Sequence, residues 1–276
     1  MTASENLVPP TWLHEHLNDP DLVVIDCRFA LADPDQGRQL YEQEHVPGAV
    51  YFDLNRDLSS PVQVHGGRHP LSDWDDFTAK LEAAGVSSAN GGKPTRVIAY
   101  DDSRFAFAGR LWWLLKYLGH DAVAVLDGGF QAWQRAGYSV STTMPEPKAG
   151  QFRPSPRTDW IVTREDVRQR KDQDGVMLID SRAPERFRGE VEPIDPVAGS
   201  IPGAVNYFWQ AVTHNDGLMR PTAELKQHWS ELGNGKEVMV YCGSGVTACV
   251  NLLSQALADQ PIGKLYVGGW SDWCSY

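Results

Sequence analysis

A cysteine set in a glycine-rich loop is the clearest chemical feature of this sequence. Residues 238–250 read VMVYCGSGVTACV, in which an apolar run ends at Tyr241 and Cys242 opens the loop CGSGVT. Glycines allow successive backbone N–H groups to point into one concavity, and a helix beginning near Val246 or Thr247 adds the positive end of its dipole. We therefore expect the sulfur to be favoured as a thiolate, the nucleophilic form of cysteine. The alternative is a buried structural cysteine beside a tight turn.

Two chemistries use a nucleophilic cysteine in such a loop. Cysteine phosphatases carry an arginine six residues after the cysteine, where it binds phosphate through two hydrogen bonds. That position here is Ala248, which disfavours a phosphatase. The sequence favours the other chemistry, the transfer of a sulfur atom through a cysteine persulfide.

The elements around this loop occur twice along the chain. Four segments of the first half match four of the second half in the same order, namely 22–28 with 177–182, 45–50 with 200–205, 97–100 with 238–241, and 126–133 with 266–273. The interval between the second and third segments is longer in the first half, which places an insertion around residues 55–75. The pattern predicts a tandem duplication with one domain over residues 1–140, a proline-rich linker over 141–158 and a second domain over 159–276.

Short apolar runs alternate with helical patterns in each half. Residues 108–118 read AGRLWWLLKYL, which is apolar at helical spacing and is followed by Gly119, a helix stop. Residues 123–126 then form an apolar run typical of a buried strand. This alternation predicts the α/β class, with a mainly parallel sheet flanked by helices on both faces in each domain. Ligands of such sheets bind beyond the carboxyl ends of the strands, which is where Cys242 lies.

Composition narrows the partners and the location. The formal net charge is −11, which disfavours nucleic acid as a partner because phosphate binding needs a basic surface. No window approaches the ~18 to 20 continuous apolar residues of a membrane span, and the first residues show no secretory signal, so we expect a cytoplasmic protein that does not bind membranes. The four cysteines lack C-x-x-C spacing, and neither a metal nor another cofactor is expected.

The whole chain resembles the two-domain rhodanese-type sulfurtransferases. The resemblance rests on DCR at 26–28, HVPGA at 45–49, GRHPL at 67–71, DSR at 180–182, ERFRG at 185–189, IPGA at 201–204 and the loop at 242–248. It implies a reactive cysteine in the C-terminal domain, a catalytically silent N-terminal domain and a site in the cleft between them. The position that matches Cys242 in the first half is Asp101, and a carboxylate oxygen cannot form a persulfide.

The composition of the loop bears on the sulfur donor. Within the family, CGSGVT resembles the members that prefer 3-mercaptopyruvate, whereas members that prefer thiosulfate carry basic residues there. Thiosulfate is a dianion and gains from positive charge, while 3-mercaptopyruvate carries one carboxylate. The resemblance implies a 3-mercaptopyruvate sulfurtransferase with a thiol, cyanide or a thioredoxin-like protein as acceptor. A thiosulfate sulfurtransferase and a non-catalytic sulfur-carrying module are the alternatives.

The resemblance also implies roles for individual residues. Cys242 is the nucleophile, Ser244 polarises or protonates the departing pyruvate oxygen, and His69 reaches Ser244 as part of a proton relay. Asp53 is the candidate relay carboxylate, with Asp57 as its alternative. The implied substrate-binding residues are Arg186, Gly243, Gly245, Val246 and Thr247.

Structural roles compete with these assignments. Arg182, Arg186 and Arg188 could form ordinary surface ion pairs, and we expect Arg182 to anchor the Asp180 turn as Arg28 anchors its counterpart. Cys249 is expected to face the core from a helix, and a redox partner for Cys242 is the alternative. His69 could instead be a loop histidine that fixes the backbone.

Two positions depart from the family pattern. Mercaptopyruvate-using relatives often have a second carboxylate-binding arginine nine residues after the first, and here that residue is Asp195. Ser200 stands where the second half would carry the histidine that the first half keeps as His45.

Overall fold

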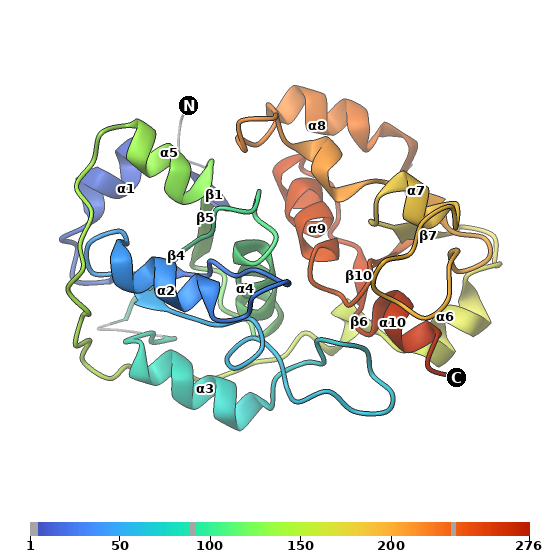
Figure 1. Cartoon of the computed structure of the whole chain (residues 1–276), viewed down its shortest axis with the longest axis horizontal. Helices are drawn as coiled ribbons and strands as arrows, with labels where there is room; N and C mark the ends of the chain where they lie inside the picture. Colours follow the sequence, from blue (N-terminus) through green and yellow to red (C-terminus); the bar gives the residue numbers. More distant parts are fainter. Residues whose placement is uncertain (1–4, 89–91, 233–235) are drawn as a thin grey trace. The chain divides into compact units, whose positions relative to one another are not determined.

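The computed structural model describes residues 5–88, 92–232 and 236–276, and the chain divides into two compact units (Figure 1). The first unit comprises the described residues of Met1–Ser60, Ser72–Arg157 and Asn215–Met219. The second comprises those of Pro61–Leu71, Thr158–His214 and Arg220–Tyr276. Segment 61–71 of the first half therefore belongs to the second unit, and segment 215–219 of the second half belongs to the first unit. The domain boundaries predicted from the sequence do not include this exchange.

The first unit is built on a parallel sheet. Within the described residues it has five strands in the order β1-β5-β4-β2-β3. The strands are β1 (Leu7–Val8), β2 (Leu22–Asp26), β3 (Val50–Tyr51), β4 (Arg96–Tyr100) and β5 (Val123–Leu126). The helices are α1 (Pro10–His16), α2 (Gln36–Gln43), α3 (Trp74–Ala83), α4 (Ala108–Tyr117) and α5 (Gly129–Arg135). The α4 helix confirms the helix expected over 108–118, and Gly119 after it has the positive φ of +81° that glycine allows.

The second unit repeats this plan. Within the part of the chain that the structure describes, its parallel sheet has five strands in the order β6-β10-β9-β7-β8, strand for strand the order of the first. The strands are β6 (Ile161–Val162), β7 (Val176–Asp180), β8 (Val205–Asn206), β9 (Glu237–Tyr241) and β10 (Lys264–Tyr266). The helices are α6 (Arg164–Arg170), α7 (Pro184–Phe187), α8 (Thr222–His228), α9 (Ala248–Leu257) and α10 (Gly269–Trp273), with 3-10 turns η1 (Thr158–Trp160), η2 (Trp209–Val212) and η3 (Ser230–Leu232). The predicted duplication of an α/β fold is confirmed.

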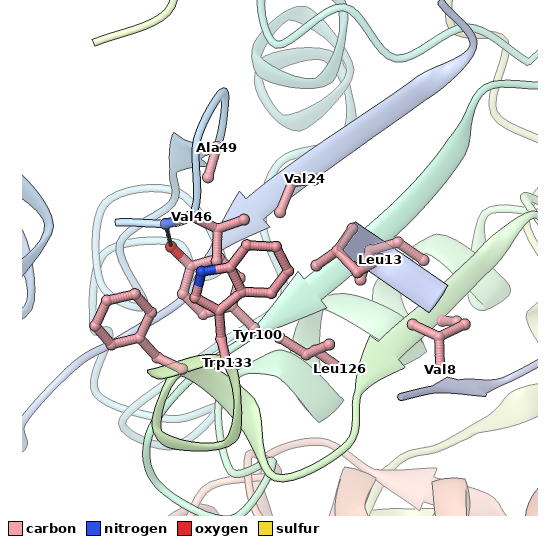
Figure 2. Close-up of a cluster of buried hydrophobic side chains, with 11 residues drawn as sticks. Val8, Leu13, Val24, Val46, Ala49, Tyr100, Leu126 and Trp133 are labelled. Atoms are coloured by element: carbon pink, nitrogen blue, oxygen red, sulfur yellow. Dashed lines mark hydrogen bonds between the residues drawn. The ribbon is translucent and has the colours of Figure 1, made fainter. Parts of the chain in front are cut away.

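Helices cover both faces of each sheet because the strands are apolar on both faces. In the first unit, the core side chains that Figure 2 shows come from the strands, from Leu13 of α1 and Trp133 of α5, and from Val46 and Ala49 in the loop before β3. The α4 helix packs on β4 and β5. In the second unit, Val167 of α6 and Trp270 of α10 pack on one face, while α9 packs against β9 and α8 against α9.

Each sheet has a buried ion-pair anchor at the carboxyl end of the strand next to one edge, β2 in the first unit and β7 in the second. In the first, the guanidinium of Arg28 donates to Asp26 at 2.7 to 3.1 Å, and Tyr100 Oη donates to the same carboxylate at 2.7 Å. In the second, Arg182 donates to Asp180 at 2.7 to 3.1 Å. Removing one partner of such a buried pair costs about 3–5 kcal/mol of folding free energy. The expected structural role of Arg182 is confirmed, and this arginine also donates to Glu192 at 3.1 Å and to the carbonyl of Gly199 at 2.6 Å.

The described helices are all short. The longest, α3, α4 and α9, have 10 residues each, which at 1.5 Å per residue is about half the thickness of a bilayer core. None of the helices in the described part of the chain is long and apolar enough to cross a membrane.

Candidate active site around Cys242

The cysteine loop joins the end of β9 to the start of α9. Cys242 follows Tyr241, the last residue of β9, and Thr247 is the residue before α9, so the helix begins next to the position expected from the sequence. The loop is fixed from α10, because the N–H groups of Trp270 and Ser271 donate to the carbonyls of the first two loop residues at 2.8 Å. Cys242 is buried and only 2% exposed. The nucleophile predicted from the sequence therefore lies at the carboxyl edge of the sheet in a rigid turn.

Gly245 is required by the shape of this turn. Its φ is +71°, a conformation that other residues rarely adopt, and a Cβ at this position would lie 2.2 Å from the carbonyl oxygen of Val267. The turn can therefore follow this path only with glycine at this position.

Four backbone N–H groups of the loop have no acceptor among the described residues. In the part of the chain that the structure describes, the N–H groups of Gly243, Ser244, Val246 and Thr247 donate to no protein acceptor. Turns of this kind commonly form anion-binding nests. The loop can therefore offer hydrogen bonds to a negatively charged group that forms on or near the cysteine.

The corresponding loop of the first unit shows what such a nest holds. Asp101 occupies the cysteine position, and its carbonyl accepts Phe130 N–H at 2.9 Å, as Cys242 accepts that of Trp270. Its carboxylate accepts N–H groups at 2.8 to 3.1 Å from four residues of the loop and the start of α4, which are Ser103, Phe105, Phe107 and Ala108. Burial raises the pKa of Asp101 to about 6, although these hydrogen bonds favour its charged form. The nest of the first unit is thus filled by its own side chain.

Ser244 and His69 are in direct contact. His69 Nδ1 lies 2.7 Å from Ser244 Oγ, and both side chains are buried. Their residues are 175 positions apart in the sequence, yet both belong to the second unit, because segment 61–71 is part of it. The structure places the predicted pair within hydrogen-bonding distance, and the proton relay assigned to it stays a prediction.

Segment 61–71 is held by the C-terminal helix and the residues after it. Gly66 N–H donates to Asp272 Oδ1 at 2.7 Å, and Arg68 N–H donates to Ser271 Oγ at 3.2 Å. The ring of His65 stacks on Tyr276 at a centroid distance of 3.9 Å. These contacts fix the segment that carries His69.

The candidate relay carboxylates have local structural roles. Asp53 belongs to the first unit, and its carboxylate accepts the N–H groups of Asn55 and Arg56 at 2.8 and 2.9 Å. Asp57 accepts the N–H of Asp53 at 2.7 Å and pairs with Lys80 at 3.4 Å. Together they close a turn after β3. Their assignment to a relay stays a prediction.

Arg186 lies against the cysteine loop. It comes from the short helix α7, and a Cβ placed on Gly243 would be 3.8 Å from its Nη2 atom. Its guanidinium donates to Glu192 at 2.6 and 3.2 Å and to Asp195 at 3.2 Å. By contrast, Arg188 is about half exposed and pairs with Glu190 at 2.7 Å. Of Arg182, Arg186 and Arg188, only Arg188 therefore forms the ordinary surface ion pair that the sequence allows for each of them.

Arg68 and Glu192 are two site residues that sequence reasoning missed. A Cβ on Gly243 would lie 2.8 Å from Arg68 Nη2, and the guanidinium of Arg68 pairs with Asp195. Burial opposes ionisation of Glu192, but hydrogen bonds from Arg186 and from two backbone N–H groups outweigh it and lower the pKa of Glu192. Burial raises the pKa of Asp195, against the effect of its two arginines. The only sequence signal for Arg68 is its place next to His69.

Two of the other cysteines, Cys27 and Cys249, are buried, and Cys274 packs against the core of the second unit. Cys249 is buried on α9, as expected, and its Sγ donates to the carbonyl of Gly245 at 3.3 Å. Burial and three nearby aspartates raise the pKa of Cys27 well above its ordinary value. All four cysteines are free thiols. Among the described residues, no group of three or more His, Cys, Asp or Glu is arranged to hold a metal ion.

Comparison with known proteins agrees with the duplicated fold and the site. The model of the rhodanese-like domain matches residues 9–136 and 163–276. The chain therefore belongs to the rhodanese-like family, as a sulfurtransferase with two copies of the domain.

The relatives at full length include named sulfurtransferases of two kinds. A probable 3-mercaptopyruvate sulfurtransferase from Pseudomonas aeruginosa is 44% identical over 98% of this chain and 95% of its own length. A putative thiosulfate sulfurtransferase from Mycobacterium tuberculosis is 38% identical over 91% of this chain and 87% of its own. The crystal structure of SseA from Escherichia coli superposes with a TM-score of 0.81 at 33% identity, covering 96% of this chain and 98% of that one.

Proposed function

We propose that this protein transfers a sulfur atom from 3-mercaptopyruvate to a thiol or to cyanide through a persulfide on Cys242. The observation that carries the proposal is the uncharged loop around Cys242, with four N–H donors that have no acceptor among the described residues and two arginines beside Gly243. The relatives named for 3-mercaptopyruvate, at up to 44% identity over nearly the whole chain, support this donor.

The first step forms the persulfide. The thiolate of Cys242 attacks the sulfur of the donor, a new S–S bond forms, and the donor's C–S bond breaks. The electron pair of that bond leaves on carbon as the enolate of pyruvate, which must take up a proton. The outer sulfur of the persulfide lies about 2.05 Å beyond Sγ, where the N–H groups of the loop can stabilise its charge.

Ser244 and His69 supply the proton in this proposal. The hydroxyl of Ser244 lies one residue from Gly243 and 2.7 Å from His69 Nδ1, so a proton can pass from the imidazole through the serine to the leaving enolate. Because both side chains are buried, solvent does not compete for this proton. Arg186 binds the donor carboxylate, for which its planar fork of N–H groups is suited.

The second step returns the cysteine to its starting state. The acceptor attacks the outer sulfur, the S–S bond breaks, and its electron pair returns to Cys242 as thiolate. Cyanide and small thiols fit this step in an assay. We propose a thiol, or a thioredoxin-like protein that offers one, as acceptor in the cell.

A direct experiment tests the mechanism. Mass spectrometry after incubation with 3-mercaptopyruvate should show one added sulfur on Cys242, together with release of pyruvate. The variant Cys242→Ser should form no persulfide and release no pyruvate, and pyruvate release by this variant would exclude the proposed mechanism. Steady-state turnover with cyanide separates an enzyme from a sulfur-carrying module, which would stop after one equivalent.

Thiosulfate is the second candidate donor. The relative from Mycobacterium tuberculosis that carries this name favours it, and the two arginines by the loop could bind a dianion. Comparison of kcat/KM for the two donors decides between them. We expect the higher value with 3-mercaptopyruvate.

A further inference from the structure

Four charged side chains form a cluster beside the cysteine loop. They are Arg68, Arg186, Glu192 and Asp195, and we call them the Asp195 cluster. Asp195 joins its two arginines, because Oδ1 accepts from Arg68 and Oδ2 accepts from Arg186 at 3.2 Å. Glu192 also accepts from Arg182 at 3.1 Å, but the charge of Arg182 is balanced by Asp180. The two positive and two negative groups of the cluster therefore have a formal charge of zero.

The cluster meets the loop at the residue next to the nucleophile. A Cβ on Gly243 would lie 2.8 Å from the guanidinium of Arg68 and 3.8 to 3.9 Å from that of Arg186. A donor whose sulfur reaches Cys242 can therefore place its anionic group near both arginines. It then also approaches Asp195, which binds both of them.

The two carboxylates of the cluster are shielded from solvent. The side chains of Asp195 and Glu192 are 2% and 3% exposed, while that of Arg68 is 31% exposed. Charges in such surroundings interact more strongly than on the surface and are less screened by salt. The buried carboxylate of Asp195 therefore acts on whatever anion the arginines bind.

We propose that Asp195 determines the donor preference of the site, favouring donors with one negative charge over donors with two. This inference rests on the proposed function and deepens it. Asp195 holds Arg68 over the loop, so a single carboxylate can bind both arginines. It also cancels one of their charges, so the second charge of a dianion such as thiosulfate gains little and is repelled by Asp195.

The variant Asp195→Asn tests this proposal. Asparagine has nearly the same shape and keeps an oxygen that can accept from Arg68, but the cluster gains one unit of positive charge. We expect the ratio of kcat/KM for thiosulfate to kcat/KM for 3-mercaptopyruvate to rise about tenfold, and the rise to shrink with increasing salt. Cyanide serves as acceptor in both assays.

Two further variants make the test specific. Glu190→Gln removes a negative charge from the segment after α7 that also carries Glu192 and Asp195. Glu190 is exposed and pairs with Arg188 rather than with a residue of the cluster, so the ratio of the two kcat/KM values should not change. The double variant Arg68→Gln/Asp195→Asn restores a net charge of zero. It should return the ratio to the wild-type value even where both efficiencies fall.

The outcomes separate the two proposals. If Asp195→Asn lowers kcat/KM equally for both donors, Asp195 has a merely structural role and the inference is overturned. The inference is also overturned if Glu190→Gln changes the ratio as much as Asp195→Asn does. In either case persulfide formation by the wild type would leave the proposed function intact. A wild-type protein that forms no persulfide with 3-mercaptopyruvate would overturn the proposed function itself.

Discussion

Arg186 offers the cysteine loop a guanidinium that two carboxylates already orient. Glu192 holds it through two hydrogen bonds and Asp195 through one, so the side chain is fixed before any donor binds. Such preorganisation reduces the entropy lost on binding. In the proposed function, the remaining donor capacity of Arg186 goes to the carboxylate of 3-mercaptopyruvate.

The variant Arg186→Lys should weaken donor binding while the fold is kept. Lysine keeps the charge but loses the planar fork that holds Glu192 and a donor together. A charge-assisted hydrogen bond contributes about 1.5–3 kcal/mol, so we expect kcat/KM for 3-mercaptopyruvate to fall about 10- to 100-fold. Steady-state assays of pyruvate release measure this effect.

Arg188→Lys is the matched control for this prediction. Arg188 lies two residues away and makes an exposed pair with Glu190, so its replacement should leave kcat/KM within about twofold. A similar loss in both variants would contradict the assignment of Arg186.

Residues of the site differ in how far the sequence predicts them. Cys242 could be found because its chemistry depends on its immediate neighbours, two glycines and a following helix. Arg68 could not, because the ion pair that defines its role is with Asp195, 127 residues later. Asp195 was recognised only as a departure from the family pattern, and its two arginines become visible only in the structure.

At the scale of elements, segment 61–71 is the part of the scaffold on which the site depends most. It has no helix or strand of its own, and it places Arg68 and His69 against the cysteine loop. One of its hydrogen bonds is from Gly66 N–H to Asp272, whose other carboxylate oxygen accepts from Tyr266 at 2.6 Å. Asp272 is thus a positioning residue.

The variant Asp272→Ala should release the segment and lower activity. Loss of a hydrogen bond to a charged group, at about 1.5–3 kcal/mol, should reduce kcat/KM for pyruvate release about tenfold or more and lower Tm. Tyr266→Phe is the matched control, because it removes the other bond to the same carboxylate and leaves Gly66 held. We expect this control to lower Tm with little change in kcat/KM. Equal activity losses in the two variants would show that the segment does not need Asp272.

Most of the elements themselves could be predicted from the sequence. The α4 helix and the strands β5 and β9 lie where the apolar runs and Gly119 predicted them, because these signals are local. The exchange of segments 61–71 and 215–219 between the units could not be predicted. A loop with no periodic pattern carries no local signal for the element that it packs against.

At the scale of the whole molecule, the duplication produces two loops of one design with different contents. The first unit keeps the strand order, the buried Asp–Arg anchor and the turn of the second. Its nest, however, is filled by the carboxylate of Asp101. Residues 30–35, which follow β2 at the place where α7 follows β7, contain no arginine. Arg38 of α2 instead lies over the ring of Tyr51 at 4.6 Å.

A cysteine alone should therefore not make the first unit active. In the double variant Asp101→Cys/Cys242→Ser, the new thiol lacks a counterpart of Arg186, and the segment that carries Arg68 and His69 belongs to the second unit. We expect pyruvate release no higher than in Cys242→Ser alone, with both proteins shown to be folded by circular dichroism. In the wild type, mass spectrometry should find one added sulfur per chain although the chain has two domains. Pyruvate release by the double variant well above that of Cys242→Ser would contradict this account, because it would show that the loop suffices for catalysis without the arginines and the histidine around it.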